Sequence, residues 1–253
     1  MRIQGVTLKN ITVVDHPNPV TSGLRQYYDI GNTSSYSGSG STVTDLSASG
    51  YGTGSLINAP TYTSAGLQSY LTFNGSNNYF QTPNLYTMAV GGSGTLNVTL
   101  EVWVRTASDN GVVLNETGNL PINSGWHDAQ IVIASGTLKG AVWPYTTIVT
   151  GSAVTRNAWQ QYVLTFNDAT NTQTLYLNGA SVGSSSIQRD FSPGAVGGTT
   201  TGLWYGIALG DVTSIGDTSY LACDWSIFKV YNRTLSATEV LQNYDAVKWR
   251  YGL

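Results

Sequence analysis

Short apolar segments alternate with clusters of Gly, Ser and Asn along most of the chain. The clearest segment is Leu96–Arg105, where a Leu or Val at every second position would share one face of a strand. Short, frequent strands separated by turn residues are typical of an all-β sandwich or barrel. The other predicted strands are Leu71–Phe73, Tyr79–Gln81, Gly111–Leu114, Gln130–Ala134, Gly140–Trp143, Gln161–Phe166, Gln173–Leu177, Leu203–Leu209 and Ile227–Tyr231.

One helix is predicted near the C-terminus. Ser236 and Glu239 have the spacing of a capping box, in which each side chain binds the backbone of the other residue. We expect Ser236 to cap this helix and an apolar stripe at helical spacing to pack against the sandwich. The stripe consists of Val240, Leu241, Tyr244 and Val247.

The first 22 residues are predicted to form an arm outside the folded domain. Residues 1–14 have a strand-like pattern, and Pro17 and Pro19 interrupt any ladder or helix that follows. We therefore assign residues 1–22 to an arm or linker and residues 23–253 to one domain. The N-terminus lacks the apolar core of a signal peptide, and no stretch of about 18 apolar residues occurs. A product made in the cytoplasm without membrane insertion is expected.

Composition and charge narrow the classes of partner. Charged residues make up 10% of the chain, against roughly 25% in typical soluble domains. The hydrophobic content of 41% is high enough to form a core and excludes disorder. The formal net charge is −3, and the chain has no stripe of basic residues that could neutralise the phosphates of a nucleic acid. Nucleic acid is therefore not an expected partner. The lone Cys223 fits neither a disulfide nor a metal-binding spacing.

Three segments together resemble a known family. They are Tyr27–Ser64 with the LTFNGSNNYFQTP that begins at Leu71, AWQQYVLTFNDATNTQTLYLNGASVGSS from Ala158, and SIFKVYNRTLSATEVLQNYDAVKWRYGL from Ser226. In this order they are similar to the laminin-G-like, concanavalin A-like lectin jelly roll, in the version common in bacteriophage and marine bacterial proteins. The resemblance implies an all-β, two-sheet antiparallel jelly-roll sandwich, with one short C-terminal helix.

The same resemblance implies a structural Ca²⁺ site. The family places an Asp near the start of the strand that precedes the YNR motif, and Asp224 matches that position. It also places an Asp just before Tyr79, where this chain has Asn78. Because Ca²⁺ prefers two or more carboxylates among its oxygen ligands, the substitution weakens the site. Asp224 is the candidate metal ligand of a site that is weak, structural or absent.

The carboxylates give little support to a glycosidase. Retaining hydrolysis needs two carboxylates about 5 Å apart, which on one strand means positions i and i+2. Asp211 and Asp217 flank one loop, where an ordinary loop pair is the simpler interpretation. His127 precedes an Asp, but no Gly-x-Ser-x-Gly turn accompanies it. The chain has three glutamates, none with a carboxylate two positions away: Glu101, Glu116 and Glu239.

Aromatic residues near predicted strand ends or loops are candidates for stacking on sugar rings. The alternative is that these large side chains fill the space between the two sheets. The candidates are Trp126, Trp143, Tyr145, Trp204 and Tyr205.

These features favour a non-enzymatic structural protein of a bacteriophage particle, either a head decoration protein or a particle-surface or adhesion component. The fold class usually works outside cells, and a virion protein reaches the outside at lysis without an export signal. The arm could dock on other virion proteins of the capsid or tail by strand addition, and surface glycans and a second copy are further candidate partners. The alternative is a free-standing carbohydrate-binding lectin module; a glycoside hydrolase is the least supported class.

Overall fold

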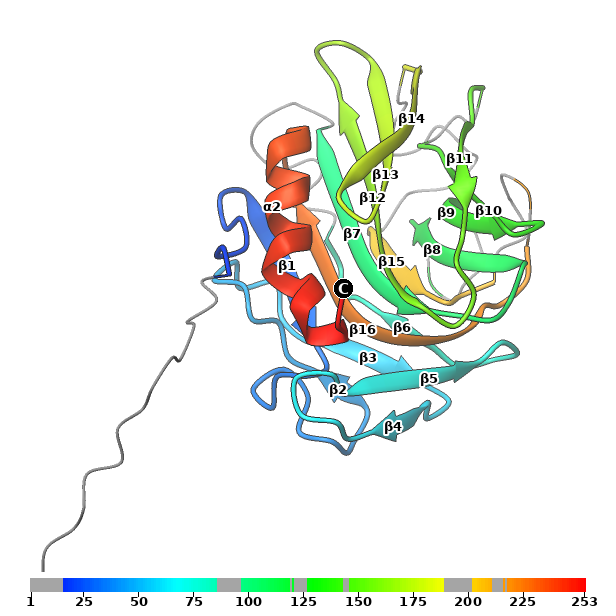
Figure 1. Cartoon of the computed structure of the whole chain (residues 1–253). Coiled ribbons are helices and arrows are strands. Elements are labelled where there is room, and N and C mark those ends of the chain that lie inside the picture. Colours follow the sequence, from blue (N-terminus) through cyan, green and yellow to red (C-terminus); the bar gives the residue numbers. More distant parts are fainter. Residues whose placement is uncertain are drawn as a thin grey trace, which may run out of the picture.

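The alternating segments form the strands of two facing antiparallel sheets (Figure 1). The computed structural model describes residues 16–85, 97–118, 120, 127–142, 146–188, 202–210, 216 and 218–253. Sheet A runs in space through β14 (Ala180–Ser186), β13 (Thr172–Leu177), β12 (Trp159–Asn167), β7 (Val98–Arg105), β16 (Ala222–Tyr231), β5 (Tyr70–Asn74) and β4 (Thr61–Thr63), and β1 (Leu24–Asp29) also pairs with β16. Sheet B runs through β11 (Val149–Ala153), β10 (Thr137–Gly140), β9 (His127–Ala134), β8 (Gly111–Thr117), β15 (Trp204–Ile207), β6 (Tyr79–Gln81), β3 (Gly54–Ile57) and β2 (Thr42–Val43).

The predicted two-sheet antiparallel sandwich is confirmed. The strand expected at Gly140–Trp143 lies earlier, as β10, and ends at Gly140. Several strands were not predicted, because their sequences contain few apolar residues. The clearest of these is β14, whose sequence is ASVGSSS and whose residues are half-buried or exposed. Low burial removes the apolar alternation by which a strand is recognised in sequence.

The core lies between the inner faces of the two sheets. The apolar face predicted for β7 is buried there, with Val98, Leu100, Val102 and Val104 at most 3% exposed. On the adjacent β12, Leu164 pairs directly with Leu100 and faces the same core. Alternating strands from distant parts of the chain therefore bring their apolar faces together in one cluster.

The outer face of sheet A carries a buried ion pair. Lys229 Nζ on β16 lies 3.1 Å from Glu101 Oε1 on β7, and both side chains are 1% exposed. Trp103 Nε1 donates to the same oxygen at 3.2 Å. Asn243 Nδ2 donates to Glu101 Oε2 at 2.7 Å from α2 (Ala237–Val247), the helix that covers this face (Figure 1). A buried charge needs such partners because its desolvation is costly.

Residues 16–22 lie against this helix and its continuation, η1 (Lys248–Tyr251). The backbone N–H of Val20 donates to Asn243 Oδ1 at 2.7 Å, and its carbonyl accepts from the Tyr231 hydroxyl at 3.0 Å. The ring of His16 stacks on Trp249. The chain is therefore docked from His16 onward, seven residues before the predicted boundary at Gly23. Residues 1–15 are not among the described residues, so the arm itself stays a prediction.

The capping box of α2 is confirmed, because the Ser236 and Glu239 side chains each bind the other residue's backbone. Val240 and Val247 are buried, as predicted for the stripe. The prediction that Leu241 packs against the sandwich is wrong, since it is 45% exposed. Asn243, which binds Glu101, shares the buried face with Val240 and Val247, and Leu241 lies at the margin of that face. No helix of the described residues is long and apolar enough to cross a membrane.

Replacing Lys229 by Met should lower the free energy of unfolding by about 3–5 kcal/mol, because the Glu101 carboxylate stays buried without its cation. Urea denaturation measures the loss. Lys248→Met is the control, because Lys248 pairs with Asp245 at the surface and should change stability far less. If Lys229→Met lowered the free energy of unfolding as little as the control does, the ion pair would not stabilise this face.

Glu239 should make stability depend on acid pH. Two hydrogen bonds from Arg233 lower the pKa of Glu239 from 4.5 to about 2. Partial burial acts in the opposite direction, and a hydrogen bond from the Ser236 N–H lowers the pKa further. A carboxyl with a lowered pKa in the folded state stabilises it above pH 4.5 and loses that effect as the pH falls toward 2. Glu239→Gln keeps a side chain that suits a capping box but removes the charge. Thermal melts should show the wild-type advantage shrinking across this window; a constant difference from pH 7 to pH 2 would contradict the assignment.

Candidate functional site

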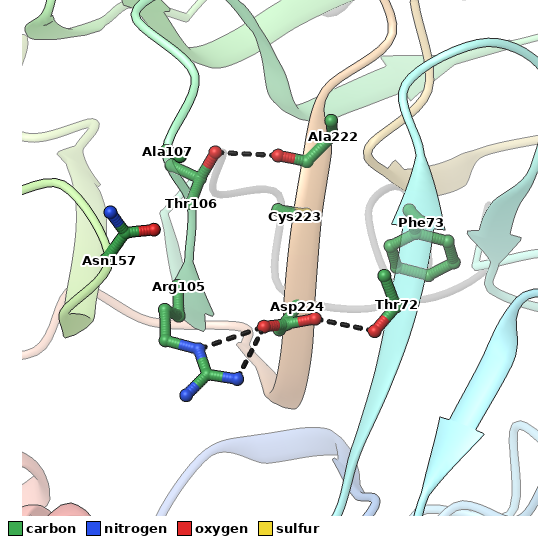
Figure 2. A pocket seen from close by; sticks show the side chains of 9 residues that line it. All are labelled: Thr72, Phe73, Arg105, Thr106, Ala107, Asn157, Ala222, Cys223 and Asp224. Carbon is green, nitrogen blue, oxygen red and sulfur yellow. Dashed lines mark hydrogen bonds and ion pairs between the residues drawn. The ribbon is translucent and has the colours of Figure 1, made fainter.

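An open cleft of about 230 Å³ lies where β5, β7 and β16 run side by side in sheet A (Figure 2). Asp224 on β16 is the register partner of Arg105 on β7 and of Thr72 on β5. Cross-strand partners point to the same face of a sheet, so the three side chains form a row across three strands. The row follows from strand register and joins residues up to 152 positions apart.

Arg105 and Asp224 form the charged floor of the cleft. Arg105 Nε and Nη2 donate to Asp224 Oδ2 at 2.9 and 2.7 Å, and Thr72 Oγ1 donates to Oδ1 at 2.6 Å. The Arg105 and Asp224 side chains are 32% and 18% exposed. Partial burial disfavours the charged guanidinium, but the bonds and charge of Asp224 outweigh it and raise the pKa of Arg105 above its ordinary value.

Two aromatic rings hold the Arg105 guanidinium in place. Its Cζ lies 4.9 Å from the ring centroid of Tyr70 and 5.3 Å from that of Trp159. Trp159 in turn stacks on Tyr251 of η1, with centroids 4.6 Å apart. Burial raises the pKa of the Tyr251 phenol, whose hydroxyl contacts that of Ser226. These contacts favour one orientation of the cation and fix it at the floor of the cleft.

The floor offers donors and acceptors side by side. Arg105 has five N–H groups, and two of them bind Asp224, so part of its donor capacity is free for a ligand or water. Asp224 accepts three hydrogen bonds and has lone-pair capacity for one more. Asn157, from the loop before β12, lines the wall opposite β16 (Figure 2). Small residues, Ala107 and Ala222, leave the space above the floor open.

Of the predicted site residues that the structure describes, Asp224 alone lines this cleft. Its bonds to Arg105 and Thr72 do not fit a Ca²⁺ ligand, because a guanidinium occupies the place where a cation would bind. Asn78, at the family's second Asp position, accepts the backbone N–H of Asn74 at 2.7 Å. Among the described residues, no group of three or more His, Cys, Asp or Glu could hold a metal ion. A structural Ca²⁺ elsewhere stays a prediction.

Of the aromatic residues proposed for glycan stacking, the two that the structure describes, Trp204 and Tyr205, do not line the cleft. Tyr205 is 1% exposed and packs edge-on against Phe228 in the core. Trp204 is half-buried on β15 in sheet B. Trp126, Trp143 and Tyr145 fall outside the residues that the structure describes. Tyr70 and Trp159, which flank Arg105 beside the cleft, were not among the candidates and fall just outside the strands predicted at Leu71–Phe73 and Gln161–Phe166.

One pair of carboxylates was missed by searching along single strands. Glu116 on β8 and Asp128 on β9 are cross-strand partners, and each is 1% exposed. Both side chains are therefore covered in this structure. Glu101 and Glu239 are engaged in the ion pair and the helix cap described above. Asp211 and Asp217 are not among the described residues.

Solved structures of low sequence identity share this fold. Domain 4 of AbnA, a GH43 extracellular arabinanase from Geobacillus stearothermophilus, in complex with arabinotriose, is 12% identical with a TM-score of 0.54, and the match covers 87% of this chain and 98% of that one. Trypanosoma rangeli sialidase in complex with sialic acid is 13% identical (TM-score 0.61), with 94% of this chain and 36% of that chain covered. The binding domain of botulinum neurotoxin DC in complex with SialylT is 12% identical (TM-score 0.59), with 90% and 52% covered.

The chain thus spans about a third of the sialidase and about half of the neurotoxin domain. At these identities the likeness shows a common sandwich fold. No curated protein matches the chain. A family model does match, over residues 74–241, which include most strands of both sheets, Arg105, Asp224 and the first part of α2. By this match the chain belongs to the concanavalin A-like lectin/glucanase superfamily.

Proposed function

We propose that this chain is a non-catalytic carbohydrate-binding module that holds a sugar unit in the cleft that Arg105 and Asp224 line together. The observation that carries the proposal is the fixed, outward-facing Arg–Asp pair at the floor of an open cleft. Sugar hydroxyls both donate and accept hydrogen bonds, and the pair offers both functions next to each other. The structures that share the fold include complexes with arabinotriose, sialic acid and SialylT.

The carboxylates support binding without hydrolysis. Among the described residues that line the cleft, Asp224 is the only carboxylate, whereas glycoside hydrolysis by the usual route uses two. Glu116 and Asp128 are adjacent but buried, and Glu101 is held by Lys229 and Asn243. A glycoside hydrolase is accordingly the less favoured function.

The bacteriophage hypothesis concerns where such a module would work. A glycan-binding sandwich suits an adhesion component of a particle surface, and the arm would attach it to capsid or tail proteins. Most of the predicted arm, residues 1–15, lies outside the described residues, and residues 16–22 contact α2 and η1 of the same chain. The virion role and its protein partners stay predictions.

Arg105→Ala should weaken carbohydrate binding by about tenfold or more, because a hydrogen bond from a charged group contributes about 1.5–3 kcal/mol. A glycan array with the wild-type chain identifies the ligand, and titration calorimetry then compares the variants. Arg156→Ala is the matched control, since Arg156 pairs with Asp109 beside the cleft but does not line it. Circular dichroism checks that each variant is folded.

Two results would contradict the proposal. Either the wild-type chain binds no glycan on a broad array, or Arg105→Ala and Arg156→Ala bind equally well. Incubation with the bound oligosaccharide should release no reducing sugar. Hydrolysis by the wild-type chain that is lost in Glu116→Gln would overturn the non-catalytic part alone.

A further inference from the structure

We infer that the cleft selects one uncharged sugar unit and discriminates against sugars that carry a carboxylate. The inference rests on the proposed function and adds the chemical class of the ligand. It depends on how charge is arranged around Arg105, on how the guanidinium is held, and on the size of the cleft.

The charges around the cleft cancel in pairs. Arg105 is matched by Asp224, and the nearby Arg156 donates through its Nε to Asp109 at 2.8 Å. Every other described residue that lines the cleft is uncharged. A site for an anionic ligand normally presents cationic groups that are not already neutralised. The cleft therefore has no net positive charge with which to attract a carboxylate.

Asp224 also opposes an anion directly. A ligand carboxylate that reached the free N–H groups of Arg105 would lie beside the Asp224 carboxylate, and like charges at such distances repel. Arg105 cannot easily swing away to meet the ligand, because Tyr70 and Trp159 flank its guanidinium. A neutral sugar meets no such penalty, since one hydroxyl can accept from Arg105 while another donates to Asp224.

The size of the cleft restricts how much of a glycan enters it. Its volume of about 230 Å³ is below the roughly 300–1,000 Å³ of pockets that enclose a drug-sized ligand. A space of that size holds one sugar ring. The remaining units of an oligosaccharide would lie over the open surface outside the cleft. The cleft therefore contacts one unit of a glycan at a time.

The test compares oligosaccharides that differ only in their carboxylates. α-1,4-Linked galactotriose and trigalacturonic acid, which has the same linkage, form such a pair, and arabinotriose adds a neutral pentose. Titration calorimetry with the full chain should give an affinity for a neutral sugar about tenfold or more higher than for its acidic counterpart. Asp224→Asn, which keeps the shape of the side chain, should narrow that ratio, because it removes the repelling charge. Asp109→Asn, outside the cleft, should leave the ratio unchanged.

The outcomes separate the inference from the proposed function. Tighter binding of trigalacturonic acid, or of sialylated glycans on the array, would overturn the inference while a carbohydrate-binding function stood. Equal affinities for the neutral and acidic members would do the same. Absence of binding to every neutral and acidic glycan would overturn the proposed function, and the inference with it. A ratio that Asp109→Asn changes as much as Asp224→Asn would also contradict it, because long-range charge rather than the cleft would then set the preference.

Discussion

The Glu101 carboxylate, buried beneath α2, is the constraint on which the outer face of sheet A depends. A carboxylate that is 1% exposed is tolerated only with partners, and they come from three elements: Lys229 from β16, Trp103 from its own strand and Asn243 from α2. Asn243 then binds the backbone of Val20. One buried charge thereby sets the position of the helix on the sheet and docks the segment that enters the domain.

A series of aromatic contacts connects α2 and η1 to the cleft. η1 continues directly from α2 and carries Tyr251. The ring centroid of Tyr251 lies 5.2 Å from that of Trp103 and 4.6 Å from that of Trp159. Trp159 borders the guanidinium of Arg105. Arg250, in the same turn, donates to the buried Asp29 of β1 at 2.7 Å and fixes the turn to the sheet. The binding side chain is therefore held by packing that begins at the helix, which suits a site whose shape exists before the ligand arrives.

The parts of the fold that could be predicted from sequence are those that depend on neighbours along the chain. The alternation in β7 and the capping box of Ser236 and Glu239 are local patterns, and both are confirmed. Two of the three partners of Glu101, Lys229 and Asn243, lie 128 and 142 positions away, so no local pattern indicates them. The same holds for the cleft, whose row of Thr72, Arg105 and Asp224 exists only once three strands take one register. Leu241 was misplaced because it lies roughly 100° around the helix from Val240, at the margin of the face that Val240, Asn243 and Val247 bury.

Amide hydrogen exchange on the full chain, with and without a saturating neutral oligosaccharide chosen from a glycan array, tests most directly whether this cleft is the binding site. We expect slower exchange in the peptides that line the cleft and no change in sheet B; these peptides contain Thr72, Arg105–Ala107, Asn157 and Ala222–Asp224. Slower exchange confined to sheet B, for example around Trp204, with no change at Arg105 and Asp224, would contradict it.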